Sequence, residues 1–91
     1  MIRRQHLHFC LALAEEADPQ LRGAEQLIWL QRLEADYANL QAALAWSLRD
    51  DTADKRDHAV GLALVGALSW FWHIRARFSE ARHWCDRALA L

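Results

Sequence analysis

The sequence predicts an all-α protein: four antiparallel helices arranged as two helical hairpins in a single domain, residues 1–91. The chain has only one proline and three glycines, while Ala, Leu, Arg, Gln and Glu, which favour helices, are abundant. Its apolar residues recur at spacings of three and four, the period of an amphipathic helix. A chain of 91 residues forms at most one small domain.

The first helix is expected over residues 2–17. Asp18 precedes Pro19, and a residue before proline avoids the helical region, so we expect the helix to stop there. Its apolar face is formed, at steps of three and four, by Leu7, Cys10, Leu11, Ala14 and Ala17.

The second helix is expected to follow a short turn and to run over residues 24–49. Neither proline nor glycine interrupts this stretch, so we predict one continuous helix, although a bend near Ala35 and Asp36 would shorten its unusual length. Its apolar stripe is Leu30, Leu33, Tyr37, Leu40 and Leu44.

Residues 50–57 are the most polar stretch and the expected linker between the hairpins, and Asp54 is a candidate N-cap. A third helix is expected over residues 59–75. Residues 59–74 contain no Asp, Glu, Lys or Arg, so we expect this helix to be the most buried and to lie at the centre of the fold.

Residues 76–78 predict a tight connection to a last helix. Ser79 is the candidate N-cap, Glu80 suits the first turn of a helix, and the helix is expected to reach residue 91. Connections this short make consecutive helices antiparallel, which gives hairpins over about residues 2–49 and about residues 54–91.

The last thirty residues, 62–91, resemble a tetratricopeptide repeat, a helix-turn-helix unit of about 34 residues. Three positions depart from that pattern. Ser69 stands where the repeat usually has glycine or alanine, Ala76 stands where it usually has the glycine of the turn, and Cys85 replaces an aromatic residue. The positions that match are Leu68 and Trp72 on the first helix, Phe78 at the turn, and Ala81, Ala88 and Leu89 on the second helix. The resemblance implies an α-solenoid fragment in which the two hairpins stack in a right-handed sense.

A longer resemblance involves residues 33–46, 70–72 and 78–84. Together they are similar to the start of the helical-repeat region of bacterial multidomain signalling ATPases and transcriptional regulators of the maltose-activator and related types. The resemblance implies a piece of such a regulator, or a stand-alone relative, that binds a protein partner, other domains of a parent regulator, or an inducer. The phosphate-binding GxxxxGK pattern of the ATPase does not occur in this sequence.

Composition argues against several classes of partner. Eleven Lys and Arg stand against twelve Asp and Glu, without a block of like charge, so direct nucleic-acid binding is not expected. The uncharged run is shorter than the roughly 20 residues that a membrane-spanning helix needs, and no export signal is recognisable. Two cysteines without a CxxC pair favour the reducing cytoplasm.

Candidate chemistry is sparse. His6 and Cys10 have the spacing that puts two metal ligands on one helical face, but further ligands would have to come from His73, His83 or Cys85, without a compact motif. Cys85 and His83 diverge on one helix and do not suggest a nucleophile with its base. We therefore expect no enzyme activity and no catalytic, cofactor-binding or metal-binding residues.

The residues that we single out are apolar and suggest an interaction surface. Two interpretations of the tryptophans stay open: they line a concave surface that grips a partner, or they fill the spaces between helices. Trp84, Leu89 and Leu91 would be exposed at an open end of the repeat stack and favour self-association. The full candidate surface is Trp29, Trp46, Trp70, Trp84, Leu89 and Leu91.

The function predicted from these observations is a non-catalytic protein–protein interaction module. One alternative is an inducer-sensing domain with a small-molecule pocket between the hairpins. The other is an adaptor that acts as a homodimer.

Overall fold

A computed structural model describes residues 2–49 and 54–90 of the chain. Regular secondary structure in these ranges is entirely helical, which confirms the all-α prediction. The predicted number of four helices is wrong, because the second helix is interrupted. The helices are α1 (Ile2–Gln20), α2 (Gln26–Ala35), α3 (Tyr37–Ser47), α4 (Lys55–Ile74) and α5 (Phe78–Leu89).

The predicted helix over residues 24–49 is divided at Asp36, where the alternative prediction placed a bend. Asp36 has φ −99° and ψ 8°, values that differ from those of an α-helix, so this one residue separates α2 from α3. No proline or glycine is present to explain the break. Instead, Tyr37, the first residue of α3, accepts a hydrogen bond from Trp72 and donates one to Glu80, so contacts with the second half of the chain accompany the change of direction.

The predicted end of the first helix at residue 17 is also wrong. Helix α1 includes Pro19 and continues to Gln20. Pro19 removes a single backbone donor near the end of the helix, and the backbone N–H of Leu21 still donates to the carbonyl of Ala17 at 3.0 Å. The loss of one hydrogen bond does not end the helix, because Leu21, the residue directly after it, is fully buried and holds the last turn against the core.

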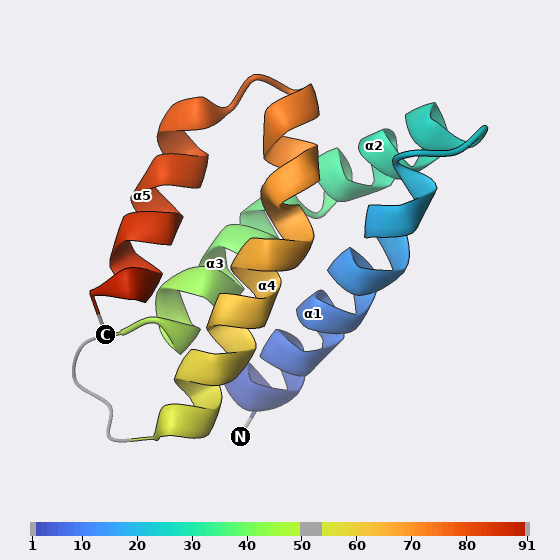
Figure 1. The fold of residues 1–91 in the computed structure, drawn as a ribbon. Coiled ribbons are helices and arrows are strands. Elements are labelled where there is room, and N and C mark those ends of the chain that lie inside the picture. The colour runs from blue at the N-terminus through green and yellow to red at the C-terminus, as the bar shows by residue number, and fades with distance from the viewer. Residues whose placement is uncertain (1, 50–53, 91) are drawn as a thin grey trace.

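Helix α4 lies at the centre of the fold, as predicted. It packs against α1, α3 and α5, and α1 packs in turn against α3 and α2. In Figure 1, α4 runs between α1 and α5 with α3 behind it, and α1 and α4 begin at the same end of the molecule. Helices α1 and α4 therefore run parallel, whereas α4 and α5 are antiparallel neighbours.

Most of the core comes from the apolar stripes that the sequence predicts, although on α1 the predicted Leu11 is only partly buried and Leu13, which was not predicted, is buried. All five stripe residues of the second predicted helix are buried. Phe71 and Trp72 of α4 are the largest fully buried side chains of the core. Helix α4 is not buried all round, however, because one face remains exposed. That face contains Ala59, Leu62, Ala63 and Gly66, of which Leu62 is 52% exposed.

Helix α4 begins four residues before the predicted position because its first turn is capped. The side chain of Asp54 accepts a hydrogen bond from the backbone N–H of Arg56 at 2.9 Å, which confirms Asp54 as the N-cap. The linker residues 50–53 lie outside the described ranges.

The turn between α4 and α5 has the hydrogen bonds of a Schellman motif. The N–H of Arg77 donates to the carbonyl of Trp72 at 2.8 Å, and that of Ala76 donates to the carbonyl of His73 at 3.1 Å. Ala76 has φ 56°, the left-handed conformation that glycine adopts most easily. Helix α5 then begins at Phe78, so Ser79 is inside the helix and is not the predicted N-cap.

Gly61 allows α3 and α4 to approach closely. A Cβ atom at Gly61 would lie 2.3 Å from Ser47 Oγ and 2.9 Å from Leu48 Cδ2. Gly66, on the exposed face of the same helix, has nothing within 4 Å of the same position. Packing therefore requires glycine at position 61 only.

Within the parts of the chain that the structure describes, no helix is both long enough and apolar enough to cross a membrane.

Ala76→Gly is expected to raise the free energy of unfolding by about 0.5–1 kcal/mol, because glycine has no steric penalty at positive φ. Urea unfolding followed by circular dichroism measures the change. The matched control is Ala63→Gly in the middle of α4, which should lower stability by about 1 kcal/mol. Equal destabilisation by both substitutions would contradict the left-handed turn.

The two glycines of α4 should respond in opposite ways to alanine. Gly66→Ala should raise the free energy of unfolding by about 0.4–1 kcal/mol, because alanine restricts the unfolded chain and clashes with nothing. Gly61→Ala should lower it by roughly 1–3 kcal/mol, because α3 must move away. The same unfolding measurement checks both, and stabilisation by Gly61→Ala would show that α3 does not approach α4 at this point.

Candidate functional site

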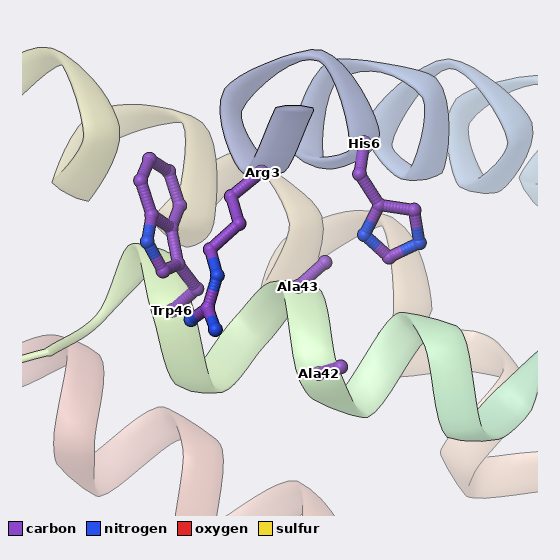
Figure 2. Close-up of a pocket in the computed structure, with 5 residues that line it drawn as sticks. All are labelled: Arg3, His6, Ala42, Ala43 and Trp46. Carbon is purple, nitrogen blue, oxygen red and sulfur yellow. The ribbon is translucent and has the colours of Figure 1, made fainter. Parts of the chain in front are cut away.

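A groove of about 310 Å³ lies between the first turns of α1 and the last turns of α3. Figure 2 shows Arg3 and Trp46 side by side at one end and His6 at the other, with two alanines of α3 between them. The lining residues are Arg3, His6, Ala42, Ala43 and Trp46. The groove is thus an apolar floor with aromatic and basic side chains around it.

Helical spacing explains how each wall is formed. Arg3 and His6 are three residues apart on α1, and Ala42 and Trp46 are four apart on α3, so each pair occupies one helical face. Ala42 and Ala43 end at Cβ, which leaves open space between α1 and α3 where longer side chains would fill it. The groove therefore depends on two consecutive small residues of α3.

Trp46 is held in place by a stacked arginine. The guanidinium carbon of Arg49 lies 3.9 Å from the centroid of the Trp46 ring, and Arg49 Nη1 donates to the Trp46 carbonyl at 2.6 Å. The guanidinium of Arg4 lies 5.8 Å from the same ring centroid. Cation–π attraction of this kind favours a fixed orientation of the indole.

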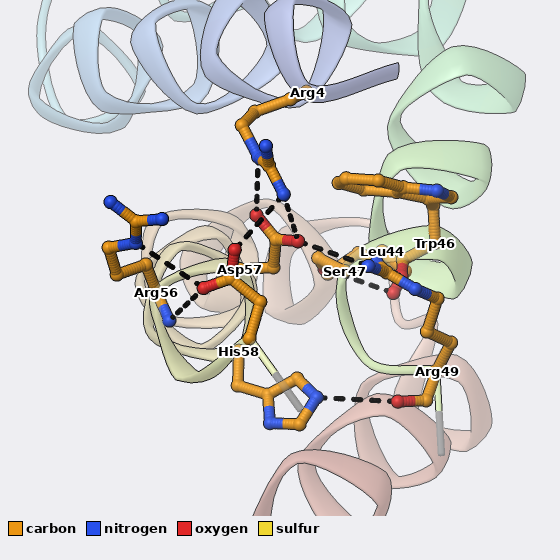
Figure 3. A network of polar contacts seen from close by, with 9 residues as sticks. Arg4, Leu44, Trp46, Ser47, Arg49, Arg56, Asp57 and His58 are labelled. Atoms are coloured by element: carbon orange, nitrogen blue, oxygen red, sulfur yellow. Dashed lines mark hydrogen bonds and ion pairs between the residues drawn. The ribbon is translucent and has the colours of Figure 1, made fainter. Parts of the chain in front are cut away.

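Arg4 and Arg49 are themselves joined through a buried carboxylate. Asp57, in the first turn of α4, is 2% exposed. It accepts hydrogen bonds from Arg4 Nε at 3.0 Å, Arg4 Nη2 at 2.9 Å and Arg49 Nη2 at 3.1 Å (Figure 3). Arg4 Nη2 also contacts Asp54 Oδ2 at 3.1 Å. The ion cluster thus connects the start of α1, the end of α3 and the start of α4.

The two arginines keep Asp57 ionised. Hydrogen bonds from Arg4, followed by those from Arg49, lower the pKa of Asp57 from 3.8 to about 2, against the opposing effect of burial. A carboxylate at this position also suits the positive end of the α4 dipole.

Arg3 differs from its neighbour Arg4 in having no acidic partner. Among residues 2–49 and 54–90, none forms an ion pair or hydrogen bond with the Arg3 side chain. Arg4, by contrast, is paired with Asp54 and Asp57. Arg3 therefore brings to the groove a positive charge that no acidic side chain of the described residues pairs with, at the end where Trp46 lies.

A second polar cluster joins the α2–α3 break to the α4–α5 turn. Trp72 Nε1 donates to the Tyr37 hydroxyl at 2.8 Å, and that hydroxyl donates to Glu80 Oε1. Arg77 Nη2 binds both carboxylate oxygens of Glu34, at 2.7 and 2.8 Å. Burial and the hydrogen bond to Glu80 raise the pKa of Tyr37 to about 12, so this hydroxyl stays protonated. The cluster therefore links the α2–α3 break to the turn between α4 and α5 by hydrogen bonds and an ion pair.

The predicted interaction residues have different surroundings. Trp84 is only 7% exposed, so the expectation that it is exposed at an open end is wrong: it packs into the core. Leu89 is 81% exposed as expected, and Leu91 lies outside the described residues. Trp29, Trp46 and Trp70 are half-buried against the core, and of these Trp46 lines the groove.

The half-buried tryptophans away from the groove each pack beside an arginine. Arg32 lies 5.0 Å from the ring centroid of Trp29, and Arg22 lies 4.7 Å from that of Trp70. Trp70 also stacks on His73 with centroids 4.9 Å apart. These contacts fit the interpretation in which the tryptophans fill spaces between and along the helices.

The predicted pair His6 and Cys10 does come together, with Nε2 and Sγ 3.6 Å apart. In the described part of the chain, no three His, Cys, Asp or Glu side chains gather as metal ligands. Burial, with a smaller contribution from Asp36, raises the pKa of Cys10 to about 11, which keeps the thiol protonated and a poor nucleophile.

Sequence reasoning missed Arg3, Ala42 and Ala43 as lining residues. The available signal was the shared helical face of Arg3 and His6 and the adjacent alanines close to Trp46. No rule of spacing, however, places the start of α1 opposite the end of α3. That requires the tertiary structure.

Asp57→Asn is expected to lower the free energy of unfolding at pH 7 by about 2–3 kcal/mol, because Arg4 and Arg49 lose a buried charge partner. Since the folded-state pKa of Asp57 lies below its usual 3.8, the stabilisation is present above about pH 4 and is lost as the pH falls towards about 2. Urea unfolding of both proteins at several pH values measures this difference.

The control for this prediction is Asp86→Asn, which removes an exposed carboxylate 3.8 Å from Arg82. It should leave stability nearly unchanged, because exposed ion pairs contribute little. The prediction fails if the two substitutions have equal effects at pH 7.

Similarity to known proteins does not provide a family for this chain. No protein-family model, curated protein or solved structure matches it. Its function has to be argued from its own residues and geometry.

Proposed function

We propose that this chain is a non-catalytic protein-interaction module of the tetratricopeptide-repeat type, part of or related to a bacterial transcriptional regulator or signalling ATPase. The packing of the helices supports the proposal. Helices α1 and α3 form one antiparallel pair, α4 and α5 form the next, and α4 packs on both helices of the first pair. Repeats that stack on their neighbours have this kind of arrangement.

Several positions that carry the resemblance have suitable surroundings. Leu68 and Trp72 are fully buried, and Ala81 and Ala88 are partly buried against the core. Ala76 adopts the left-handed conformation at the turn where the repeat usually has glycine. Phe78 departs from the pattern, because this aromatic side chain is 60% exposed.

The observation that carries the proposal is the amount of apolar surface left uncovered. Among the described residues, six large apolar side chains are between 52% and 81% exposed: Phe9, Leu27, Ile28, Leu62, Phe78 and Leu89. Leu27 and Ile28 are consecutive on α2, where they present apolar surface that the fold itself does not use. Neighbouring exposed apolar side chains such as Leu27 and Ile28 favour a contact with another protein, whereas isolated ones are common on any surface.

Two other functions remain as candidates. Leu89, exposed at the end of α5, favours a homodimeric adaptor. The groove favours a small-molecule sensor, although it lies between α1 and α3 within the first hairpin and not between the hairpins.

The interaction proposal predicts that contacts with a partner map to the apolar positions. A photoreactive amino acid at Ile28 should give a discrete adduct with another protein in cells of the organism that encodes the chain, because Ile28 would lie in the interface. The control is the same amino acid at Arg82, an exposed polar position on α5, where no such adduct should form. Gel electrophoresis and mass spectrometry identify the adducts.

Either of two outcomes would contradict this prediction: no adduct from Ile28, or the same adducts from both positions. An adduct of the chain with itself would favour the homodimer instead. Light scattering over a range of concentrations would then give the mass of a dimer, and Leu89→Glu would restore a monomer if the exposed end of α5 forms the contact.

A further inference from the structure

The groove between α1 and α3 combines an arginine that has no acidic partner among the described residues with an apolar floor. Arg3 has no acidic partner among the described residues, whereas the neighbouring Arg4 is paired with Asp54 and Asp57. The floor is made by Ala42 and Ala43, whose side chains carry no polar atom. This combination suits a ligand with one negative charge and one apolar surface.

The form of the walls narrows the class of ligand. The guanidinium of Arg3 is a planar fork of donors that matches the two oxygens of a carboxylate. Trp46 beside it and His6 at the far end are flat rings on either side of the alanine floor (Figure 2). A planar ring fits between aromatic walls and against an apolar floor better than a branched or fully polar group does.

We propose that this groove binds a small aromatic carboxylate. The ring of the ligand lies on Ala42 and Ala43 between Trp46 and His6, and its carboxylate accepts hydrogen bonds from Arg3. The ion cluster contributes indirectly, because Arg49 stacks on Trp46 and is itself bound by Asp57. The Trp46 wall is therefore oriented before a ligand arrives.

The volume of the groove limits the size of the ligand. At about 310 Å³ it lies at the lower end of the roughly 300–1,000 Å³ range for small-molecule sites. One ring with a short acidic side chain suits this space. A bare inorganic anion would leave the apolar floor uncovered and would gain only the contact with Arg3.

This site does not rest on the protein-interaction function proposed above. Its residues lie on α1 and α3, whereas the consecutive apolar residues Leu27 and Ile28 lie on α2. A chain without a protein partner would still bind the ligand, and a chain that does not bind the ligand could still be an interaction module. Failure of one proposal is therefore distinguishable from failure of the other.

The test uses the full chain and phenylacetate as the probe, with binding measured by isothermal titration calorimetry. Phenylacetamide keeps the ring and removes the charge, and acetate keeps the charge and removes the ring. We expect phenylacetate to bind at least about tenfold more tightly than either compound, because a charge-assisted hydrogen bond and the burial of a ring each contribute more than about 1.4 kcal/mol, which corresponds to tenfold.

Three variants locate the binding. Arg3→Gln should weaken phenylacetate binding roughly tenfold and leave phenylacetamide binding unchanged, because only the charged contact is lost. Ala42→Phe should abolish binding by filling the groove. Arg82→Gln, on the distant α5, is the control for loss of positive charge and should bind as the unmodified chain does. Circular dichroism confirms that each variant is folded.

An independent readout comes from the indole N–H signals of the five tryptophans in the ¹H–¹⁵N NMR spectrum. Phenylacetate should shift the signal of Trp46, assigned with Trp46→Phe, more than those of Trp29 and Trp84. The proposal is overturned if phenylacetate shows no binding up to roughly 10 mM, which is about ten times a millimolar dissociation constant. It is also overturned if Arg3→Gln or a folded Ala42→Phe binds as tightly as the unmodified chain, or if acetate binds as tightly as phenylacetate.

Discussion

Helix α4 packs against α1, α3 and α5 at once, and the rest of the structure depends on this packing. Its Phe71 and Trp72 are the largest side chains that the fold buries completely. Gly61 brings α4 so close to α3 that a methyl group would not fit between them. Because a chain of this size has few other apolar contacts to offer, α1 and α3 on one side and α5 on the other depend on α4 to cover their apolar faces. The two pairs of helices therefore form one cooperative unit.

Two polar clusters fix the orientation of α4, one at each end. Asp57 binds Arg4 of α1 and Arg49 beyond α3 at the start of the helix, and Trp72 binds Tyr37 near its end. Such buried polar contacts contribute little net stability compared with apolar packing. A buried polar group that loses its hydrogen-bond partner is costly, however, so these contacts favour one arrangement of the helices over others. The same clusters have a consequence for the groove: Arg49, bound by Asp57, stacks on Trp46 and holds one wall in place.

The helical class, the apolar stripes and the central position of α4 are predictable from the sequence, because a period of three to four residues and a long uncharged run are local signals. The break at Asp36 coincides with the bend that the sequence suggested near Ala35 and Asp36. The sequence alone does not require this break, since no proline or glycine marks it and the contacts of Tyr37 come from residues far along the chain. Helix α1 continues past Pro19 because the burial of Leu21, directly after the helix, outweighs the local preference for ending before a proline. The groove escaped prediction for a related reason: Arg3 and Trp46 are 43 positions apart in the chain and meet only after folding. Trp84 was predicted to be exposed but is buried, because the apolar character of a tryptophan does not distinguish a core position from an interaction surface.

The central claim, that α4 holds both helix pairs in one unit, is tested most directly by native-state hydrogen exchange measured by NMR. If α4 is the shared core, the amides of residues 64–72 exchange slowest, at the rate set by global unfolding, and the buried segments of α1 and α3 reach the same limit. Helix α2, whose residues are mostly exposed, exchanges much faster. The account is contradicted if the amides of α4 and α5 exchange together at a lower free energy while α1 and α3 stay protected, because α4 and α5 would then unfold independently of α1 and α3.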